Sequence, residues 1–348
     1  MSGVRSTGQG PLPGTDPLEA TRIIRGELGD PHLPHLIQLP GRGIGSDAVG
    51  RTVALLTELY ADVQPHGWRL TERPGMDHRR AVSALASDLG VLADVIGASG
   101  TEAGPLKLQL RGPLSLAATV SLHHGEKILS DAGARRDLAE SLADGAAGHL
   151  RDLRRVTGAG PLAVVIEEPE AAAILEGTIP TASGYRTLRA MPRHEATGHW
   201  AALVHGLRDA GAETVVLSPG PGFPSAPTAG GTTWGDLVGD ALAAGFDTLM
   251  LGAGADMGAW ERMAELVDEG GQLWLEAIDP LGVLPGVNAT VERIHRPFRM
   301  IGMPDAQLGA LTLLPAPGLE QTTPETVRRV LHRLTQTADA LGQLRVGG

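Results

Sequence analysis

The chain has 348 residues, of which 42% are hydrophobic and 20% are charged, so it can bury a large core. It contains no cysteine, which excludes disulfides, a thiol nucleophile, iron–sulfur clusters and thiolate ligands for zinc. The 29 Lys and Arg residues against 40 Asp and Glu residues give a net charge of −11, which disfavours nucleic acid and anionic membranes as partners. We expect neither a membrane-spanning segment nor a signal peptide, and therefore a cytoplasmic protein.

The hydrophobic pattern predicts strands that alternate with helices. The expected strands are residues 7–12, 67–71, 106–111, 163–168, 214–218, 248–252, 272–277 and 310–314. The expected helices are residues 47–63, 78–96, 134–156, 195–210, 233–244, 259–269 and 324–341. The last helix has a clear start signal, with Thr323 as N-cap and Pro324 at the first helical position.

This alternation predicts a parallel sheet with right-handed crossovers, in the α/β class. Eight strands favour a closed (β/α)8 TIM-type barrel, and no strand precedes the Gly-x-Gly-x-x-Gly turn of a dinucleotide fold. Without repeats or linkers, residues 1–348 are predicted to form one domain with an N-terminal extension or loop insertion. Residues 1–14 are expected to be flexible or to form the first strand. Functional residues should then lie at the C-terminal ends of the strands.

Five segments carry a resemblance to a known family. They are residues 8–16, 33–43 and 107–113, with Ile166-Glu167-Glu168-Pro169 and Leu314-Pro315-Ala316-Pro317-Gly318-Leu319. On these the chain resembles the cobalamin-independent methionine synthases, in particular short actinobacterial proteins similar to the C-terminal catalytic barrel. The uroporphyrinogen decarboxylases belong to the same superfamily. The resemblance implies methyl transfer from methylated folate to the thiol of homocysteine, in methionine biosynthesis, with zinc activating the thiol.

The family's zinc-ligand positions hold other side chains in this sequence. The implied His-x-Cys pair falls, within one residue, on Leu217 and Pro219, the carboxylate ligand on Gly252 and the last cysteine on Pro317. The substrate-positioning serine falls on Pro11. Because these side chains donate no lone pair to a metal, we expect no zinc and no other cofactor.

Two hypotheses about function follow. In the first, the chain is a non-catalytic or altered relative, a pseudoenzyme that binds a small molecule or a protein partner. In the second, it is an active S-methyltransferase that uses non-standard ligands or no metal. Whether the protein is an enzyme, its ligand and its oligomeric state stay open at this point.

Glu167 and Glu168 end the expected strand at 163–168 and are the first candidates for the site. Neighbouring residues of a strand point to opposite faces, so one should face the barrel axis and the other could cap a helix. Two acids at a buried mouth repel each other, and one pKa could rise toward the range of a general acid. Glu167, at the aspartate of the family's Asp-Glu-Pro, is the candidate catalytic residue.

Two arginines are candidate ligand clamps. Arg42 lies between two glycines, where its guanidinium could bind a substrate carboxylate or pair with an acid of the protein. Arg111 ends the expected strand at 106–111 and would either clamp a ligand or pair with Glu167 or Glu168.

Ser218 and Asp279 complete the candidate ligand-binding residues. Ser218 begins a Gly- and Pro-rich loop, residues 218–231, which we expect to be a lid or an irregular loop in place of the family's metal-binding turn. Asp279 lies at the exit of the expected strand at 272–277. The adjacent His123 and His124 would diverge on a helix, which favours solvated or capping histidines over a metal pair.

Overall fold

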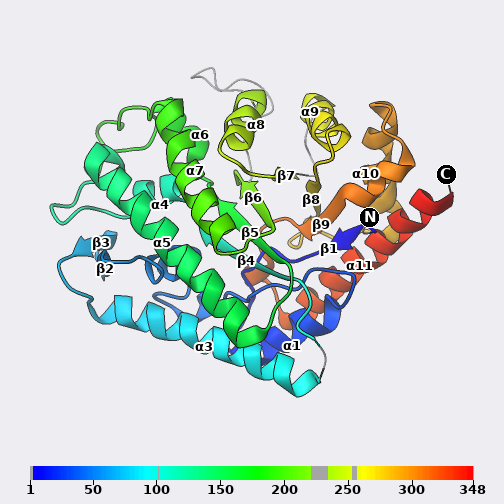
Figure 1. The fold of residues 1–348 in the computed structure, drawn as a ribbon, viewed down its shortest axis with the longest axis horizontal. Coiled ribbons are helices and arrows are strands. Elements are labelled where there is room, and N and C mark those ends of the chain that lie inside the picture. The colour runs from blue at the N-terminus through cyan, green and yellow to red at the C-terminus, as the bar shows by residue number, and fades with distance from the viewer. Residues whose placement is uncertain (1–2, 101, 221–233, 253–256, 348) are drawn as a thin grey trace.

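A parallel sheet of seven strands forms the centre of the computed structural model (Figure 1). The structure describes residues 3–100, 102–220, 234–252 and 257–347. The strand order is β1-β9-β8-β7-β6-β5-β4, and each neighbouring pair is parallel. These strands are β1 (Arg5–Ser6), β4 (Leu106–Arg111), β5 (Leu162–Glu167), β6 (Thr214–Ser218), β7 (Thr248–Gly252), β8 (Leu273–Ile278) and β9 (Leu311–Pro315). The predicted α/β fold of the (β/α)8 type is confirmed.

Residues 33–39 connect the two edge strands of this sheet, β1 and β4. Isolated parallel bridges join Thr7 to Leu33, Pro11 to Gln38 and His35 to Lys107. The segment therefore takes the second strand position of an eight-stranded barrel, although it forms no regular strand. Of the predicted strand at residues 7–12, only isolated bridges at Thr7 and Pro11 form, because the regular strand β1 ends at Ser6.

The predicted strand at residues 67–71 forms, but outside the barrel. It is β3 (Gly67–Thr71), which pairs antiparallel with β2 (Tyr60–Gln64) in a separate hairpin. Its place in the barrel was therefore wrongly predicted. Gly67 has a φ of 106°, which allows the tight turn that reverses the chain between these strands.

Helices surround the sheet on its outer side (Figure 1). They are α1 (Pro17–Glu27), α2 (Ala48–Val53), α3 (Met76–Ser99), α4 (Pro113–Thr119), α5 (Ala132–Thr157), α6 (Ala171–Glu176), α7 (Arg193–Asp209), α8 (Trp234–Ala243), α9 (Met257–Asp268), α10 (Val287–Met300) and α11 (Pro324–Gly347). Predictions for α3, α5, α7, α8, α9 and α11 are confirmed within a few residues. The predicted helix at 47–63 is wrong beyond α2, because the chain turns at Glu58, whose φ is +61°, and enters β2.

Helix α3 is long and apolar enough to cross a membrane by length and composition. In the structure it packs along α1, α2 and α5, and its Asp88 is completely buried against two arginines. These contacts are those of a helix in the outer layer of a barrel.

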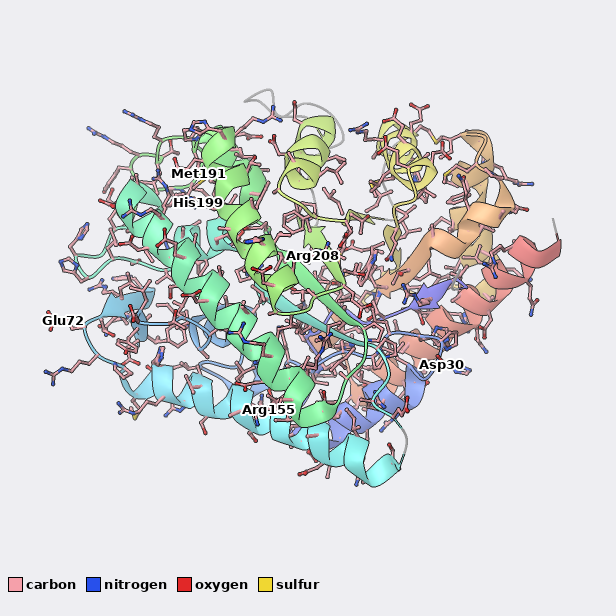
Figure 2. All side chains as sticks on the ribbon, in the orientation of Figure 1. Asp30, Glu72, Arg155, Met191, His199 and Arg208 are labelled. Atoms are coloured by element: carbon pink, nitrogen blue, oxygen red, sulfur yellow. The ribbon has the colours of Figure 1, made fainter. Side chains whose placement is uncertain are left out.

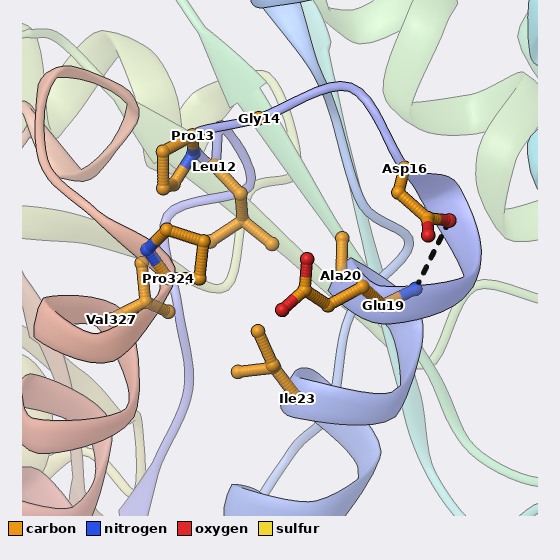
Figure 3. Close-up of a pocket in the computed structure, with 9 residues that line it drawn as sticks. All are labelled: Leu12, Pro13, Gly14, Asp16, Glu19, Ala20, Ile23, Pro324 and Val327. Carbon is orange, nitrogen blue, oxygen red and sulfur yellow. Dashed lines mark hydrogen bonds between the residues drawn. The ribbon is translucent and has the colours of Figure 1, made fainter.

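The starts of α1 and α11 lie close together beside the segment that follows β1 (Figure 3). The Asp16 carboxylate accepts hydrogen bonds from the Leu18 and Glu19 amides at 2.8 and 3.3 Å, which caps α1. Thr323 Oγ1 accepts from the Thr326 amide at 3.2 Å, as predicted for the N-cap of α11. The cavity between these elements is about 10 Å³, which suits a single water molecule and no larger ligand.

Two apolar layers support the barrel. The larger one lies between the strands and the helices, while charged side chains such as those of Glu72 and Arg155 lie at the periphery (Figure 2). The smaller one is a separate inner cluster composed of Leu33, Ala163, Val165, Val216, Met250, Trp274 and Leu314. Successive side chains of a strand point to opposite faces, so the residue two positions after each strand member of the inner cluster also points to the inner face.

Two glycines of α5 provide a matched test of packing. A Cβ at Gly145 would lie 1.6 Å from the carbonyl oxygen of Leu55, whereas one at Gly148 would meet only Arg151 Nη2 at 4.0 Å. We expect Gly145→Ala to lower the free energy of unfolding by about 1–3 kcal/mol through overpacking. Gly148→Ala should raise it by up to about 1 kcal/mol, because alanine is the better helix former. Urea denaturation followed by circular dichroism measures both, and equal stabilities would contradict the described contact.

Candidate functional site

A cavity of about 260 Å³ opens at the C-terminal ends of β4, β5 and β6. It is lined by Gln9, Pro11, Ala48, Arg111, Glu167, Pro169, Ser218, Gly220, Pro317 and Glu320. This is the end of the barrel at which (β/α)8 enzymes bind their substrates. We refer to this cavity as the mouth cavity.

Three of the predicted site residues share one wall of the mouth cavity. Strand register places Arg111 beside Glu167 and Glu167 beside Ser218. Arg111 Nη1 lies 3.9 Å from Glu167 Oε2, and both side chains remain partly exposed. Burial raises the pKa of Glu167, and the positive charges of Arg111 and Lys107 oppose that rise. The wall thus presents a cation, a carboxylate and a hydroxyl to one small space.

Glu168 points away from the mouth cavity and caps α4. Its carboxylate accepts hydrogen bonds from the amides of Leu114 at 3.1 Å and Ser115 at 2.6 Å, and from Trp200 Nε1 at 2.9 Å. Burial raises the pKa of Glu168, while these hydrogen bonds lower it. A Cβ at Gly112 would lie 2.1 Å from Glu168 Oε1, so the cap needs glycine there. The structure therefore places Glu168 in a structural role beside the site.

Replacement of Glu168 by glutamine tests this role. One carboxylate oxygen becomes an NH2 group, which cannot accept from the amide that faces it. We expect Glu168→Gln to lower the free energy of unfolding by about 1–3 kcal/mol, the cost of a buried group without a partner. Glu140→Gln, at a well-exposed carboxylate of α5, is the control and should change little. Urea unfolding of both variants checks this, and an unchanged midpoint for Glu168→Gln would refute the capping role.

Arg42 belongs to a buried ion cluster and not to the mouth cavity. Its Nη1 and Nη2 each lie 2.7 Å from an oxygen of Asp88, and Arg51 pairs with the same carboxylate. Asp88 is completely buried, and this bidentate geometry is the strong arrangement of an arginine and a carboxylate. Arg42 was expected either to bind a substrate carboxylate or to pair with an acid of the protein, and in the structure it pairs with an acid.

The other candidates lie outside the cavity wall. Asp279 is exposed, and its carboxylate accepts from the Leu281 amide at 2.9 Å to shape the loop after β8. His123 and His124 are exposed, with their rings edge to face at 5.3 Å. Of the loop at 218–231, only Ser218 to Gly220 fall within the described residues.

Gln9 forms part of the cavity wall and rests on a buried lysine. Lys107 Nζ donates to the Gln9 carbonyl at 3.0 Å and to Gln109 Oε1 at 2.9 Å. Lys107 is completely buried inside the barrel, where loss of solvation lowers its pKa to about 7, although Glu167 opposes the shift. The lysine thereby anchors the chain after β1 to β4.

The pKa of Lys107 predicts a specific pH dependence of stability. A folded-state pKa below the ordinary value of 10.5 means that the folded protein binds fewer protons than the unfolded chain between pH of about 7 and 10.5. The contribution of Lys107 to the free energy of unfolding therefore rises with pH through that window. Lys107→Met should remove this part of the slope, whereas Lys127→Met, at a partly exposed lysine, should retain it. Urea denaturation at several pH values measures the slopes, and identical slopes for wild type and Lys107→Met would refute the assignment.

The implied zinc-ligand positions do not fit a metal. Leu217 is buried in the outer core, and the pleat of β6 turns Ser218 to the cavity instead, with Gly220 beyond it. Gly252 has no side chain, and Pro317 contributes a ring carbon surface to the cavity. Within the described residues, no group of three His, Asp or Glu side chains could hold a metal ion. This donor set lacks the imidazole and thiolate ligands that zinc takes.

Three polar residues at or beside the mouth were not named as site candidates from the sequence. Gln9 and Glu320 line the cavity, and Glu276 of β8 bonds to Gln9 from behind. Glu276 shares the inner face with Trp274. The two-residue spacing between them was the signal in the sequence that Glu276 faces the inside of the barrel. Gln9 lies in the expected strand at residues 7–12 and in the segment 8–16 that carries the resemblance, which was the signal available for it.

Comparison with solved structures indicates the fold. A B12-independent methionine synthase from Shewanella sp. W3-18-1, in complex with selenomethionine, matches with a TM-score of 0.61 and 12% identity over 100% of both chains. A β-1,4-D-mannanase from Cryptopygus antarcticus reaches 0.45 at 9% identity over 96% of this chain and 93% of the other. No protein-family model and no curated protein matches the sequence. At 12% identity the likeness to the methionine synthase concerns the barrel and not the chemistry.

Proposed function

We propose that this protein is a methionine-synthase-like barrel that binds a small amino-acid-type ligand in the mouth cavity and does not carry out zinc-dependent methyl transfer. The observation that carries the proposal is the wall formed by Arg111, Glu167 and Ser218. Opposite charges 3.9 Å apart in a cavity of about 260 Å³ suit a ligand that bears both a carboxylate and an ammonium group.

Each end of such a ligand finds a partner. The guanidinium of Arg111 is free to bind a carboxylate because its contact with Glu167 is a loose one at 3.9 Å. Glu167 and Glu320 give the cavity wall a negative charge that favours a ligand with an ammonium group, and Ser218 supplies a hydroxyl for a hydrogen bond. The methionine synthase of the comparison was crystallised with selenomethionine, an amino acid of this kind.

The absence of suitable donors at Leu217, Pro219, Gly252 and Pro317 supports the second half of the proposal. The residues that surround the cavity can hold a ligand and a proton, but they do not form a zinc site. We therefore derive no step that passes through a metal.

A second candidate function is methyl transfer to a thiol without a metal. The raised pKa of Glu167 favours it, because a carboxylate that holds a proton more tightly is a better base for a thiol. Glu167 would take the thiol proton, the sulfur would take the methyl group from the donor nitrogen of methylated folate, and the proton would return to that nitrogen. Product formation from homocysteine and methylated folate in the presence of a chelator would favour this function over binding alone.

Calorimetric titration with L-methionine tests the proposed function. We expect binding to the wild-type protein, and a loss of affinity of about tenfold or more in Arg111→Gln, since charged hydrogen bonds contribute about 1.5–3 kcal/mol. Arg80→Gln, at an exposed pair on α3, is the control and should bind as wild type. The purified protein should contain far less than one zinc per chain by elemental analysis. Stoichiometric zinc, or equal affinity for Arg111→Gln, would contradict the proposal.

A further inference from the structure

Glu276 occupies an unusual position in the barrel. On the inner face of β8, it lies in register with Gly252 of β7 and Leu314 of β9. Neither of these two neighbours has a polar side chain, so neither offers the carboxylate a partner. Its side chain is partly exposed, although the inner cluster lies directly beneath it at Trp274.

The Glu276 carboxylate fills the space beside Gly252. A Cβ built at Gly252 would lie 3.7 Å from Glu276 Oε2, which is ordinary van der Waals contact. The carboxylate that the family resemblance implies on β7 is missing, and a carboxylate from β8 stands next to its place. A carboxyl group therefore lies at this side of the barrel, but it comes from a different strand.

Gln9 connects Glu276 to the mouth cavity. Its Nε2 donates to Glu276 Oε1 at 3.1 Å and to the Pro315 carbonyl at 2.9 Å, which uses both amide hydrogens. The Gln9 side chain itself lines the cavity. Within the described residues, Glu276 Oε2 has no hydrogen-bond or ion-pair partner, so it is the available acceptor on this side.

Among the described residues, no positively charged group influences the pKa of Glu276. The elements packed against it present Gly252 and Leu314, which do not titrate, and Gln9, which is neutral. Burial raises the pKa of Glu276 to about 7, and the Gln9 hydrogen bond is the opposing influence. The charged groups of the mouth, which are Arg111, Glu167, Glu320 and, beneath Gln9, Lys107, are not among the causes of this shift.

We propose that Glu276 is a ligand-binding residue that receives the ammonium group of the bound ligand and releases a proton as it does so. The inference rests on the proposed function, because it assigns one end of the same ligand. An ammonium group beside Oε2 would favour the ionised carboxylate, so the ligand and the proton compete for Glu276. Affinity should therefore rise with pH until Glu276 is ionised in the free protein.

Titration calorimetry with L-methionine between pH 6 and pH 8 tests this inference. In wild type, affinity should rise with pH, and the heat of binding should depend on the ionisation enthalpy of the buffer, which reports proton release. Glu276→Gln should bind about tenfold more weakly at pH 8, equivalent to about 1.4 kcal/mol, with little dependence on pH. The desamino analogue 4-(methylthio)butanoate should bind wild type and Glu276→Gln equally. Glu269→Gln, at an exposed carboxylate after α9, should behave as wild type.

The outcomes separate the two proposals. If L-methionine binds wild type without proton release and binds Glu276→Gln equally, the role of Glu276 is overturned while the proposed function stands. If wild type binds neither L-methionine nor its analogue, both proposals fall. Proton release is measured on the wild-type protein, so the test holds even if Glu276→Gln fails to fold.

Discussion

The buried carboxylate of Glu168 joins three elements at the mouth of the barrel. It extends from the end of β5, caps the first turn of α4 and accepts a hydrogen bond from Trp200 of α7. A carboxylate without water is costly unless its oxygens are satisfied, so these donors must stay in place. The end of β5 is thereby fixed, and with it the side chain one residue earlier, Glu167, which faces the cavity.

A second fixed point lies at Gln9, on the wall of the mouth cavity. Lys107 is buried within the barrel and holds the main chain at Gln9, while the Gln9 side chain bonds to Glu276 and to the Pro315 carbonyl. Polar groups thus connect β4, the segment after β1, β8 and β9 above the apolar inner cluster. The mouth thus combines hydrogen bonds that fix its main chain with side chains, Lys107, Glu167 and Glu276, whose pKa values are shifted by burial.

The sequence predicted the parts of the fold that have a regular pattern. Strands β4 to β9 are short apolar runs between amphipathic helices, and the two-residue period separated the roles of Glu167 and Glu168. The barrel position of residues 33–39 could not be predicted, because the segment contains Pro34, His35 and Gln38 and forms only isolated bridges. The contact between Gln9 and Glu276 joins residues 267 positions apart, and no local pattern reports such a distance.

Arg42 is another residue whose partner could not be predicted from the sequence. Its position between glycines is compatible with a ligand clamp, and the pairing with Asp88 depends on how α3 packs against the segment that contains Arg42. Helical periodicity predicted α3 itself, but not which loop it would meet. The identity of a charged partner is a tertiary property, so the sequence left two alternatives for this residue.

The irregular segment at residues 33–39, which takes the second strand position, has a consequence for the motions of the barrel. The Leu36 amide donates to the Lys107 carbonyl of β4, and the Lys107 amide donates to the Pro34 carbonyl. The side chain of Gln109 donates one more hydrogen bond to the Leu36 carbonyl, in place of a continuous ladder. Opening of a structure begins where cooperative pairing is weakest. Breathing of the barrel would therefore start along this segment, and the buried Lys107, which bonds to the Gln9 carbonyl beside it, is the contact that resists the opening.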